Sequence, residues 1–214
     1  MDTKANATHV TIATDNAAGA VAPRPLRLAV IVASNREGRF GPVVANWFAG
    51  HTATRQDFET RVVDLADVDL PTALSHDPAP AVLAELAKVR PVLAEADAFV
   101  VITPEYNHSF PASLKALIDW HFTEWQAKPV AFVSYGGISG GLRAVEQLRQ
   151  VYAEMHSVTL RDTVSFAGVH GSFTEDGTLK DPEIPDAAAT GLLDRLAWWG
   201  EALREAKAVR PYTV

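Results

Sequence analysis

The chain of 214 residues contains no cysteine. This excludes disulfides, thiolate nucleophiles and zinc–thiolate centres, and it is consistent with a reducing cytoplasm, which we predict as the location. Its seven histidines show no HExxH motif or other ligand spacing, so we predict no metal site. No apolar run approaches the roughly 18 residues that a membrane span needs, and we expect no membrane insertion.

Positive charge is also scarce. The chain has 19 Lys and Arg against 26 Asp and Glu, which gives a net charge of −7. A nucleic-acid binder needs a basic surface to displace counterions, so we predict no nucleic-acid partner. The sequence also lacks both the GxxxxGK[ST] loop and the GxGxxG fingerprint, which argues against those two ways of holding a nucleotide.

What is present fits one soluble domain, because 48% of the residues are hydrophobic and 21% are charged. Residues 1–25 are rich in Ala and Thr and lack the basic start and apolar block of a secretory signal, so we predict a disordered tail there. The predicted domain spans residues 26–207, and residues 208–214 form a short C-terminal tail.

Apolar segments with strand character alternate with amphipathic segments. Predicted strands span residues 26–34, 60–66, 97–103, 128–135 and 156–166. Predicted helices span about 42–50, 79–96, 111–118, 142–151 and 186–207. Gly50 is expected to end the first helix, and the buried stripe of the second is expected to be Val82, Leu83, Leu86 and Leu93. This alternation predicts an α/β fold with an open parallel sheet covered on both faces. Ligands in such sheets bind at the carboxyl ends of the strands, near a switch in strand order.

The loop after the first strand, "SNREGRFG", has features of an anion site. It leads into a helix N-terminus, which offers free N–H groups and partial positive charge. Ser34 adds a hydroxyl group, and Arg36 and Arg39 carry guanidinium groups suited to phosphate. Gly41 lets the backbone approach a ligand closely. Solvated arginines on an ordinary loop remain the alternative.

The loop after the third strand carries a stiff polar segment, "PEYN". Pro104 restricts its own φ and the residue before it, so Glu105, Tyr106 and Asn107 leave the strand along a defined path. Their backbone groups suit the edge of a flat heterocycle, and Tyr106 can stack on or beside such a ring.

These residues carry a family resemblance. Ser34-x-Arg36-x-x-Arg39, together with "TPEYNHSFPASLKALIDW", closely resembles the NADPH-dependent FMN reductase family, which includes quinone, azo-dye and chromate reductases. The resemblance implies a flavodoxin-like three-layer α/β/α sandwich with a five-stranded parallel sheet. It implies that Ser34, Arg36 and the start of the next helix bind the FMN phosphate. It also implies that residues 104–107 line the isoalloxazine edge.

A third loop, "SYGGISGG", follows the fourth strand, and the resemblance brings it to the flavin ring. The predicted cofactor-binding residues are Ser34, Arg36, Arg39, Phe40, Gly41, Pro104, Glu105, Tyr106, Asn107, Tyr135, Gly136 and Gly137. No catalytic side chain is predicted, because FMN would carry the chemistry.

The function implied is an oxidoreductase that passes hydride from NADPH or NADH to FMN. Electrons then pass to a small acceptor such as a quinone, a free flavin, an azo compound or a metal oxyanion. One open site used in turn predicts ping-pong kinetics.

Two other functions are considered. A flavodoxin-like electron carrier would bind FMN without turning over a small substrate. A serine hydrolase would use Ser139, because Gly137–Gly141 fits the GxSxG elbow and Asp162 and His170 follow in triad order.

A homodimer or homotetramer is expected from the resemblance. The aromatic residues Trp120, Phe122 and Trp125 could form part of its interface, or they could close the core of the monomer.

Overall fold

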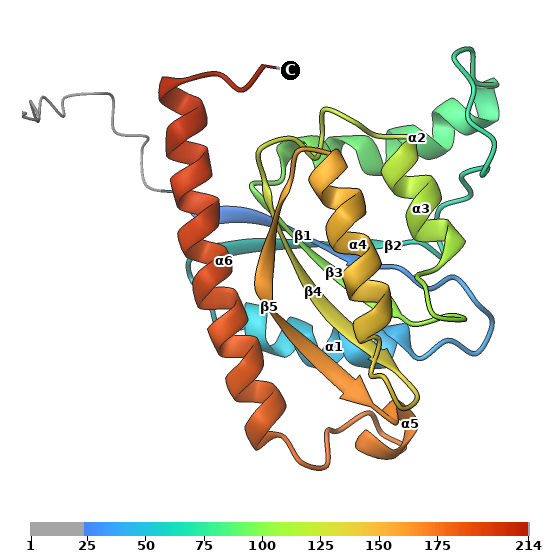
Figure 1. The fold of residues 1–214 in the computed structure, drawn as a ribbon, viewed down its shortest axis with the longest axis vertical. Helices are drawn as coiled ribbons and strands as arrows, with labels where there is room; N and C mark the ends of the chain where they lie inside the picture. Colours follow the sequence, from blue (N-terminus) through green and yellow to red (C-terminus); the bar gives the residue numbers. More distant parts are fainter. Residues whose placement is uncertain (1–23, 214) are drawn as a thin grey trace, which may run out of the picture.

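The computed structural model describes residues 24–213, and residues 1–23 of the predicted tail lie outside the described part. The sheet consists of five parallel strands in the order β2-β1-β3-β4-β5 (Figure 1). The strands are β1 (Leu26–Val32), β2 (Phe58–Asp64), β3 (Ala98–Pro104), β4 (Pro129–Gly136) and β5 (Val158–Ala167). The helices are α1 (Gly41–Ala53), α2 (Pro80–Glu95), α3 (Ala112–Asp119), α4 (Leu142–Glu154), α5 (Val169–Ser172) and α6 (Glu183–Val209).

The strand order is that of flavodoxin-like folds, and it reverses between β1 and β3. The predicted doubly covered parallel sheet is therefore confirmed.

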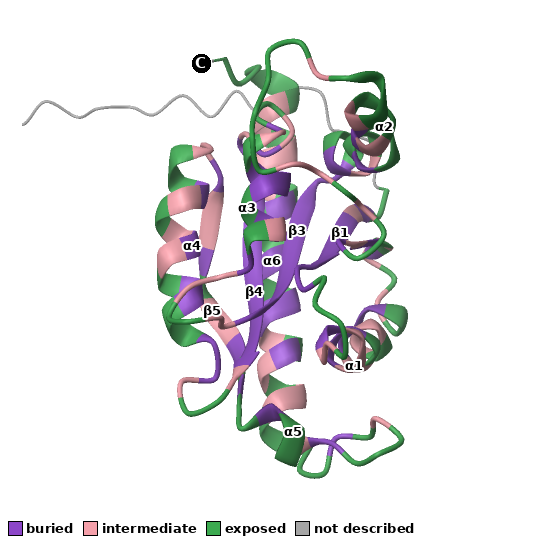
Figure 2. Ribbon diagram, turned by 90° about the vertical axis from the view of Figure 1, so that its right-hand side faces the viewer, coloured by how far each residue is buried: buried purple, intermediate pink, exposed green. Residues whose placement is uncertain are grey.

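Helices cover both faces of the sheet, as the residue pattern of β1 requires. Leu28, Val30 and Val32 pack on one face under α1 and α6. Ala29 and Ile31 pack on the other face under α2, α3 and α4. Strand β3 is buried along its whole length, and β4 is buried up to its last residue, Gly136 (Figure 2). This double burial explains why β3 reads as a continuous apolar run rather than an alternating one.

Two details of the predicted helices are wrong. Gly50 does not end α1, which continues through it to Ala53. Leu83, expected on the buried stripe of α2, is 49% exposed, and Val89 is buried instead. The buried stripe of α2 is Leu86, Val89 and Leu93, spaced i, i+3 and i+7 on one face.

Trp120, Phe122 and Trp125 lie near α3 and were expected either in a subunit interface or in the core of the monomer. The structure places the three residues differently. Trp125 is fully buried in the core of the protein itself, between Phe99 and Tyr152. Trp120 donates its indole N–H to the Pro71 carbonyl at 2.7 Å. Phe122 is 49% exposed, so of the three only this residue is largely accessible to a partner.

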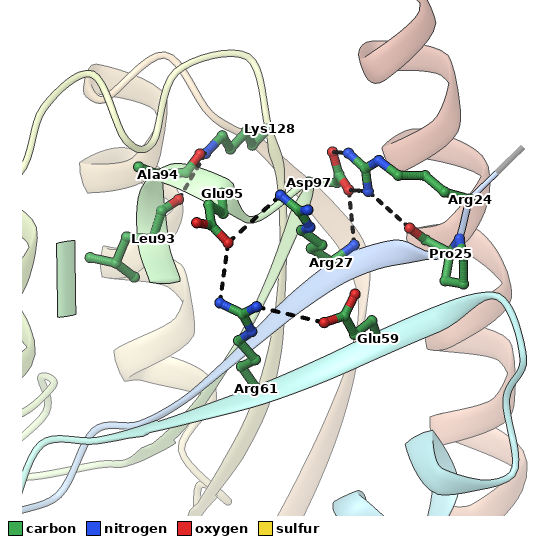
Figure 3. A network of polar contacts seen from close by, with 10 residues as sticks. All are labelled: Arg24, Pro25, Arg27, Glu59, Arg61, Leu93, Ala94, Glu95, Asp97 and Lys128. Carbon is green, nitrogen blue, oxygen red and sulfur yellow. Dashed lines mark hydrogen bonds and ion pairs between the residues drawn. The ribbon is translucent and has the colours of Figure 1, made fainter. Parts of the chain in front are cut away.

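The N-terminal edge of the sheet, opposite the candidate site, carries a polar network (Figure 3). Arg24 makes two hydrogen bonds to the Asp97 carboxylate, at 2.7 and 3.0 Å, and so fixes the start of the described chain. Buried Lys128 donates to the Leu93 and Ala94 carbonyls at 2.8 and 2.9 Å. It thereby caps the C-terminal end of α2, where free carbonyls carry partial negative charge.

Candidate active site

The three loops singled out in the sequence meet at the carboxyl edge of the sheet. Between them lies a cavity of about 290 Å³, near the lower end of the size range of ligand pockets. We call it the main cavity. Its lining residues are Arg36, Phe40, Pro104, Glu105, Tyr106, Tyr135, Gly136, Gly137, Gly168, Val169 and His170. The chain thus brings eight predicted residues to one cavity, at the point where the strand order reverses.

The other four predicted residues lie around this cavity without lining it. Ser34 is fully buried below it, and its Oγ shares a hydrogen bond of 2.5 Å with the Tyr106 hydroxyl group. Gly41 forms the first turn of α1. Asn107 sits at the tip of the second loop, and Arg39 turns toward β2.

Most backbone N–H groups of the first loop have no backbone partner. Of residues 35–40, all within the described part, only Arg39 uses its N–H in a backbone hydrogen bond, to the Arg36 carbonyl at 3.1 Å. Phe40 holds the N-cap position of α1 and offers no side-chain cap. In the first turn of α1, Pro42 has no N–H and the Val43 N–H bonds to the Phe40 carbonyl at 3.1 Å. Of residues 41–43, all within the described part, Gly41 therefore has the N–H that is free to bind an anion.

The two loop arginines have different surroundings. Arg39 makes a bidentate ion pair with Asp64 at the end of β2. It also donates a hydrogen bond to the Ser34 carbonyl at 2.8 Å. The hydrogen bond from Arg39 to Asp64 raises the pKa of the guanidinium group. Its charge is already matched, so it holds the loop in place. Arg36 lines the main cavity, with its guanidinium 5.7 Å from the centre of the Tyr106 ring.

The second loop closes a tight hairpin just after β3. Tyr106 and Ser109 exchange two backbone hydrogen bonds, of 2.9 and 3.0 Å. The two residues between them, Asn107 and His108, have φ values of 49° and 73°. Positive φ at both central positions defines a type I′ turn, which favours Asn followed by Gly. This turn aims the Tyr106 side chain at the Ser34 hydroxyl group.

The turn supports a stability prediction. His108 has a Cβ in the left-handed region, so we expect His108→Gly to raise the free energy of unfolding by about 1 kcal/mol. The contact that it loses, to Arg143 at 3.2 Å, is exposed and worth little. Urea unfolding would measure the change. His76→Gly, at an exposed loop histidine without positive φ, is the control and should be neutral or slightly destabilising. Equal effects of the two substitutions would contradict the prediction.

Glu105 joins the second loop to the third. Its carboxylate is only 5% exposed and accepts hydrogen bonds from the Ser139 hydroxyl at 2.7 Å and the Arg143 backbone N–H at 3.2 Å. The Arg143 guanidinium lies 2.5 Å from the same carboxylate. Burial alone would raise the pKa of Glu105, but the bonds from Ser139 and Arg143 outweigh it and lower the pKa. The ionised carboxylate therefore fixes the Gly-rich loop against the "PEYN" segment.

Tyr135 forms part of the floor of the main cavity. It is 4% exposed, and its buried hydroxyl group has no hydrogen-bond partner among the described residues. Burial raises the pKa of Tyr135 by more than the nearby Ser34 hydroxyl lowers it, so the group stays protonated and can donate. A Cβ on Gly41 would lie 3.1 Å from this hydroxyl and 3.0 Å from Val32, so glycine keeps the space in front of it open.

These features fit the phosphate and ring of FMN. The first loop supplies free N–H groups, an uncapped helix N-terminus and the Arg36 guanidinium. Tyr135 supplies a buried donor that lacks a partner, beside the space that Gly41 leaves open. Tyr106 and the backbone of residues 136–137 supply a flat wall for a ring.

One part of the main cavity was missed in the sequence. Gly168, Val169 and His170 reach it from the end of β5 and the short helix α5. The His170 ring packs edge-to-face on Phe40, with 5.0 Å between ring centres. The signal was available, because β5 ends at the same edge of the sheet as the other strands. The polar segment after β5 carries none of the motifs from which the site was predicted.

The hydrolase hypothesis fails on geometry. Ser139 donates to Glu105, and Asp162 pairs with Arg195 at 3.1 Å. Within residues 24–213, no hydrogen bond joins His170 to either of them. A serine nucleophile needs a histidine base within reach, and here its hydroxyl group faces a carboxylate that also binds arginine.

Fold and site together define a flavodoxin-like α/β protein with a crevice at its switch point whose residues fit a phosphate and a flat ring. Residues 26–171 match the family model described as NADPH-dependent FMN reductase. The chain belongs to this family, so it is an oxidoreductase that works with FMN and a reduced nicotinamide nucleotide. The sequence predictions of family, enzyme class and cofactor are confirmed.

Individual relatives agree with this assignment. An NAD(P)H-dependent FMN reductase of Schizosaccharomyces pombe is 35% identical over 58% of this chain and 64% of its own length. A probable NADPH:quinone oxidoreductase of rice (Oryza sativa subsp. japonica) is 32% identical over 84% of this chain and 92% of its own. FerB, an NAD(P)H:acceptor oxidoreductase from Paracoccus denitrificans, shares the fold with a TM-score of 0.66. That comparison covers 83% of this chain and 98% of FerB at 21% identity.

Proposed function

We propose that the main cavity holds FMN and serves a reduced nicotinamide nucleotide and a small electron acceptor in turn. The first loop and the N-terminus of α1 would hold the phosphate, with Arg36 and the Tyr135 hydroxyl as side-chain donors. Pro104, Glu105 and Tyr106 would line one side of the ring, and Gly136 and Gly137 the other. When bound, FMN supplies two-electron redox chemistry between NAD(P)H and the acceptor.

The chain's own residues bind and orient in this proposal. Arg39 holds the first loop against Asp64 and is a positioning residue, not a phosphate ligand. Glu105 holds the third loop through Ser139 and Arg143. A single site that the nucleotide and the acceptor use in turn would give ping-pong kinetics. The acceptor is proposed to be a quinone, a free flavin, an azo compound or a metal oxyanion.

The single observation that carries the proposal is the buried Tyr135 hydroxyl without a partner, beside free loop N–H groups at the switch point. A visible spectrum of the purified protein, followed by NADPH without oxygen, tests it. Bound FMN that bleaches with NADPH is the expected result. Flavin that stays oxidised would favour the electron carrier. A protein that takes up no FMN would refute the site.

Arg36 gives the sharpest test of the phosphate assignment. Arg36→Ala removes a charged donor worth about 1.5–3 kcal/mol to a phosphate, so we expect FMN affinity to fall roughly 10- to 150-fold. Quenching of flavin fluorescence on titration would measure the affinity. Arg161→Ala, at a side chain that is 94% exposed on β5, is the matched control and should bind FMN normally. A free riboflavin titration should not distinguish the variants, because riboflavin lacks the phosphate.

We also propose a homodimer or homotetramer in the cytoplasm. Exposed Phe122 beside α3 supports an interface between subunits, and the lack of cysteine is consistent with a reducing compartment. Within residues 24–213, no helix is long and apolar enough to cross a membrane.

A further inference from the structure

A second cavity, of about 330 Å³, lies beside the main cavity. We call it the side cavity. Tyr106 is a wall of both cavities, and the first loop divides between them, with Asn35 lining the side cavity and Arg36 the main cavity. The remaining walls of the side cavity are the segment after β2 and the first turns of α3. It therefore adjoins the site where FMN would sit, with Tyr106 as the shared wall.

The walls of the side cavity are fixed. After β2, the Leu65 N–H bonds to the Val32 carbonyl at 3.1 Å and the Asp69 N–H to Glu85 at 3.0 Å. The Pro71 carbonyl accepts from Trp120. On the other side, the Ser113 hydroxyl donates to the Ala33 carbonyl at 2.7 Å. A segment anchored at three points opposite an anchored helix makes a preformed cavity rather than a gap under a loose loop.

The chemistry of the side cavity differs from that of the main cavity. Its floor is apolar, with Leu65 and Ala116 only 2% and 4% exposed. None of its lining residues, all within the described part, is Lys, Arg or His, and its one ionisable acid is Asp69. Asp69 is exposed to solvent and so lies at the rim of the cavity. An anionic ligand would meet its carboxylate there without a compensating cation among the lining residues. Asn35, whose carboxamide makes no hydrogen bond among the described residues, can donate to a carbonyl oxygen.

We propose that the side cavity seats the uncharged, apolar part of the electron acceptor, and that the acceptor is of the quinone class. This inference rests on the proposed function, because it places the acceptor next to the FMN site. The apolar floor of the side cavity suits a quinone ring or its alkyl substituent, and the Asn35 amide can donate to a quinone carbonyl. They disfavour oxyanions and sulfonated dyes, which carry the charge that Asp69 repels. Tyr106, the shared wall, would contact both the acceptor and the cofactor.

Direct binding tests the proposal without turnover. The probe is 1,4-dimethoxynaphthalene, which is uncharged and accepts no electrons, titrated calorimetrically into the oxidised FMN-loaded protein. Ala112→Phe fills the side cavity from an exposed position on α3, and Ala87→Phe adds the same ring at an exposed position on α2. We expect Ala112→Phe to weaken probe binding roughly tenfold or more, and Ala87→Phe to leave it unchanged.

A comparison of an anionic probe with the neutral probe provides a second, independent test. The anionic probe 1-naphthalenesulfonate should bind more weakly than the neutral probe, and Asp69→Asn should narrow that difference. If Ala112→Phe does not fold, Thr72→Phe fills the side cavity from its opposite wall. Equal probe affinity in the filled variant and its control would overturn the proposal, and so would sulfonate binding as tight as that of the neutral probe.

The same titration separates this inference from the proposed function. FMN content per protein is read from the visible spectrum of each variant. Protein that takes up no FMN would refute the main site, and repeating the titration on flavin-free protein would still report on the side cavity. Displacement of the neutral probe by added FMN would place the probe in the main cavity and overturn the side-cavity assignment.

Discussion

Gly141→Ala is expected to destabilise the protein by about 2–4 kcal/mol. Gly141 ends the third loop with φ at +87°, a conformation that costs alanine about 1 kcal/mol. A Cβ there would also lie 2.7 Å from the Ser134 Cβ and 2.9 Å from the Tyr135 backbone nitrogen. Backbone cannot move aside as a flexible side chain can, so overpacking adds about 1–3 kcal/mol. Urea unfolding of the two proteins would measure the difference.

The same loop supplies a control for Gly141→Ala. A Cβ on Gly137 would meet no atom within 4 Å, and its φ is not positive. Gly137→Ala should therefore change stability by less than about 1 kcal/mol. If both substitutions cost the same, the strain and close approach assigned to Gly141 would be wrong.

The second large effect concerns pH. Lys128 is 6% exposed, and burial, with a smaller contribution from Lys207, lowers its pKa from 10.5 to about 7. Between these values the unfolded chain binds a proton that the folded chain does not. The free energy of unfolding therefore rises with pH across this window, by up to 1.4 kcal/mol per pH unit. Below pH 7 Lys128 is protonated in both the folded and the unfolded chain. The free energy of unfolding is then lowered by the full cost of burying the ammonium group.

Replacing the amine isolates this contribution. The stability of the wild type relative to Lys128→Met should increase by about 3 kcal/mol between pH 7 and 9.5. Urea unfolding at several pH values would give the two curves. Lys115→Met, which removes an exposed lysine paired with Asp119, is the control for the change in net charge. Parallel curves for the wild type and Lys128→Met would show that the amine does not titrate in this window.

Much of the fold and site could be predicted because the signals are local. The "AFVV" run (98–101) is buried on both faces in β3, as its composition requires. Pro104 and the segment after it follow from backbone stiffness and from a motif in one short stretch. Once the strands were identified, the rule that parallel strands share one carboxyl edge placed the three loops together.

What the sequence left open depends on contacts between distant residues. Arg39 was predicted as a phosphate ligand because arginine suits phosphate. In the structure its guanidinium group forms an ion pair with Asp64, at the end of the neighbouring strand β2. The burial of Val89 rather than Leu83 depends on the rotation of α2 against the sheet, which a short apolar stripe does not determine. His170 enters the main cavity through a single-turn helix, too short to carry a periodic signal.

The donor groups gathered around Gly41 also bear on how long the protein survives in a cell. A ligand that binds only the folded chain stabilises it by about 2.7 kcal/mol when its free concentration is one hundred times its dissociation constant. In the proposed site, the exposed loop N–H groups would exchange water for the phosphate of FMN, and the buried Tyr135 hydroxyl would gain a hydrogen bond. The fraction of molecules open to proteases should then fall as riboflavin supply rises, and the abundance of the enzyme would follow the vitamin status of the cell.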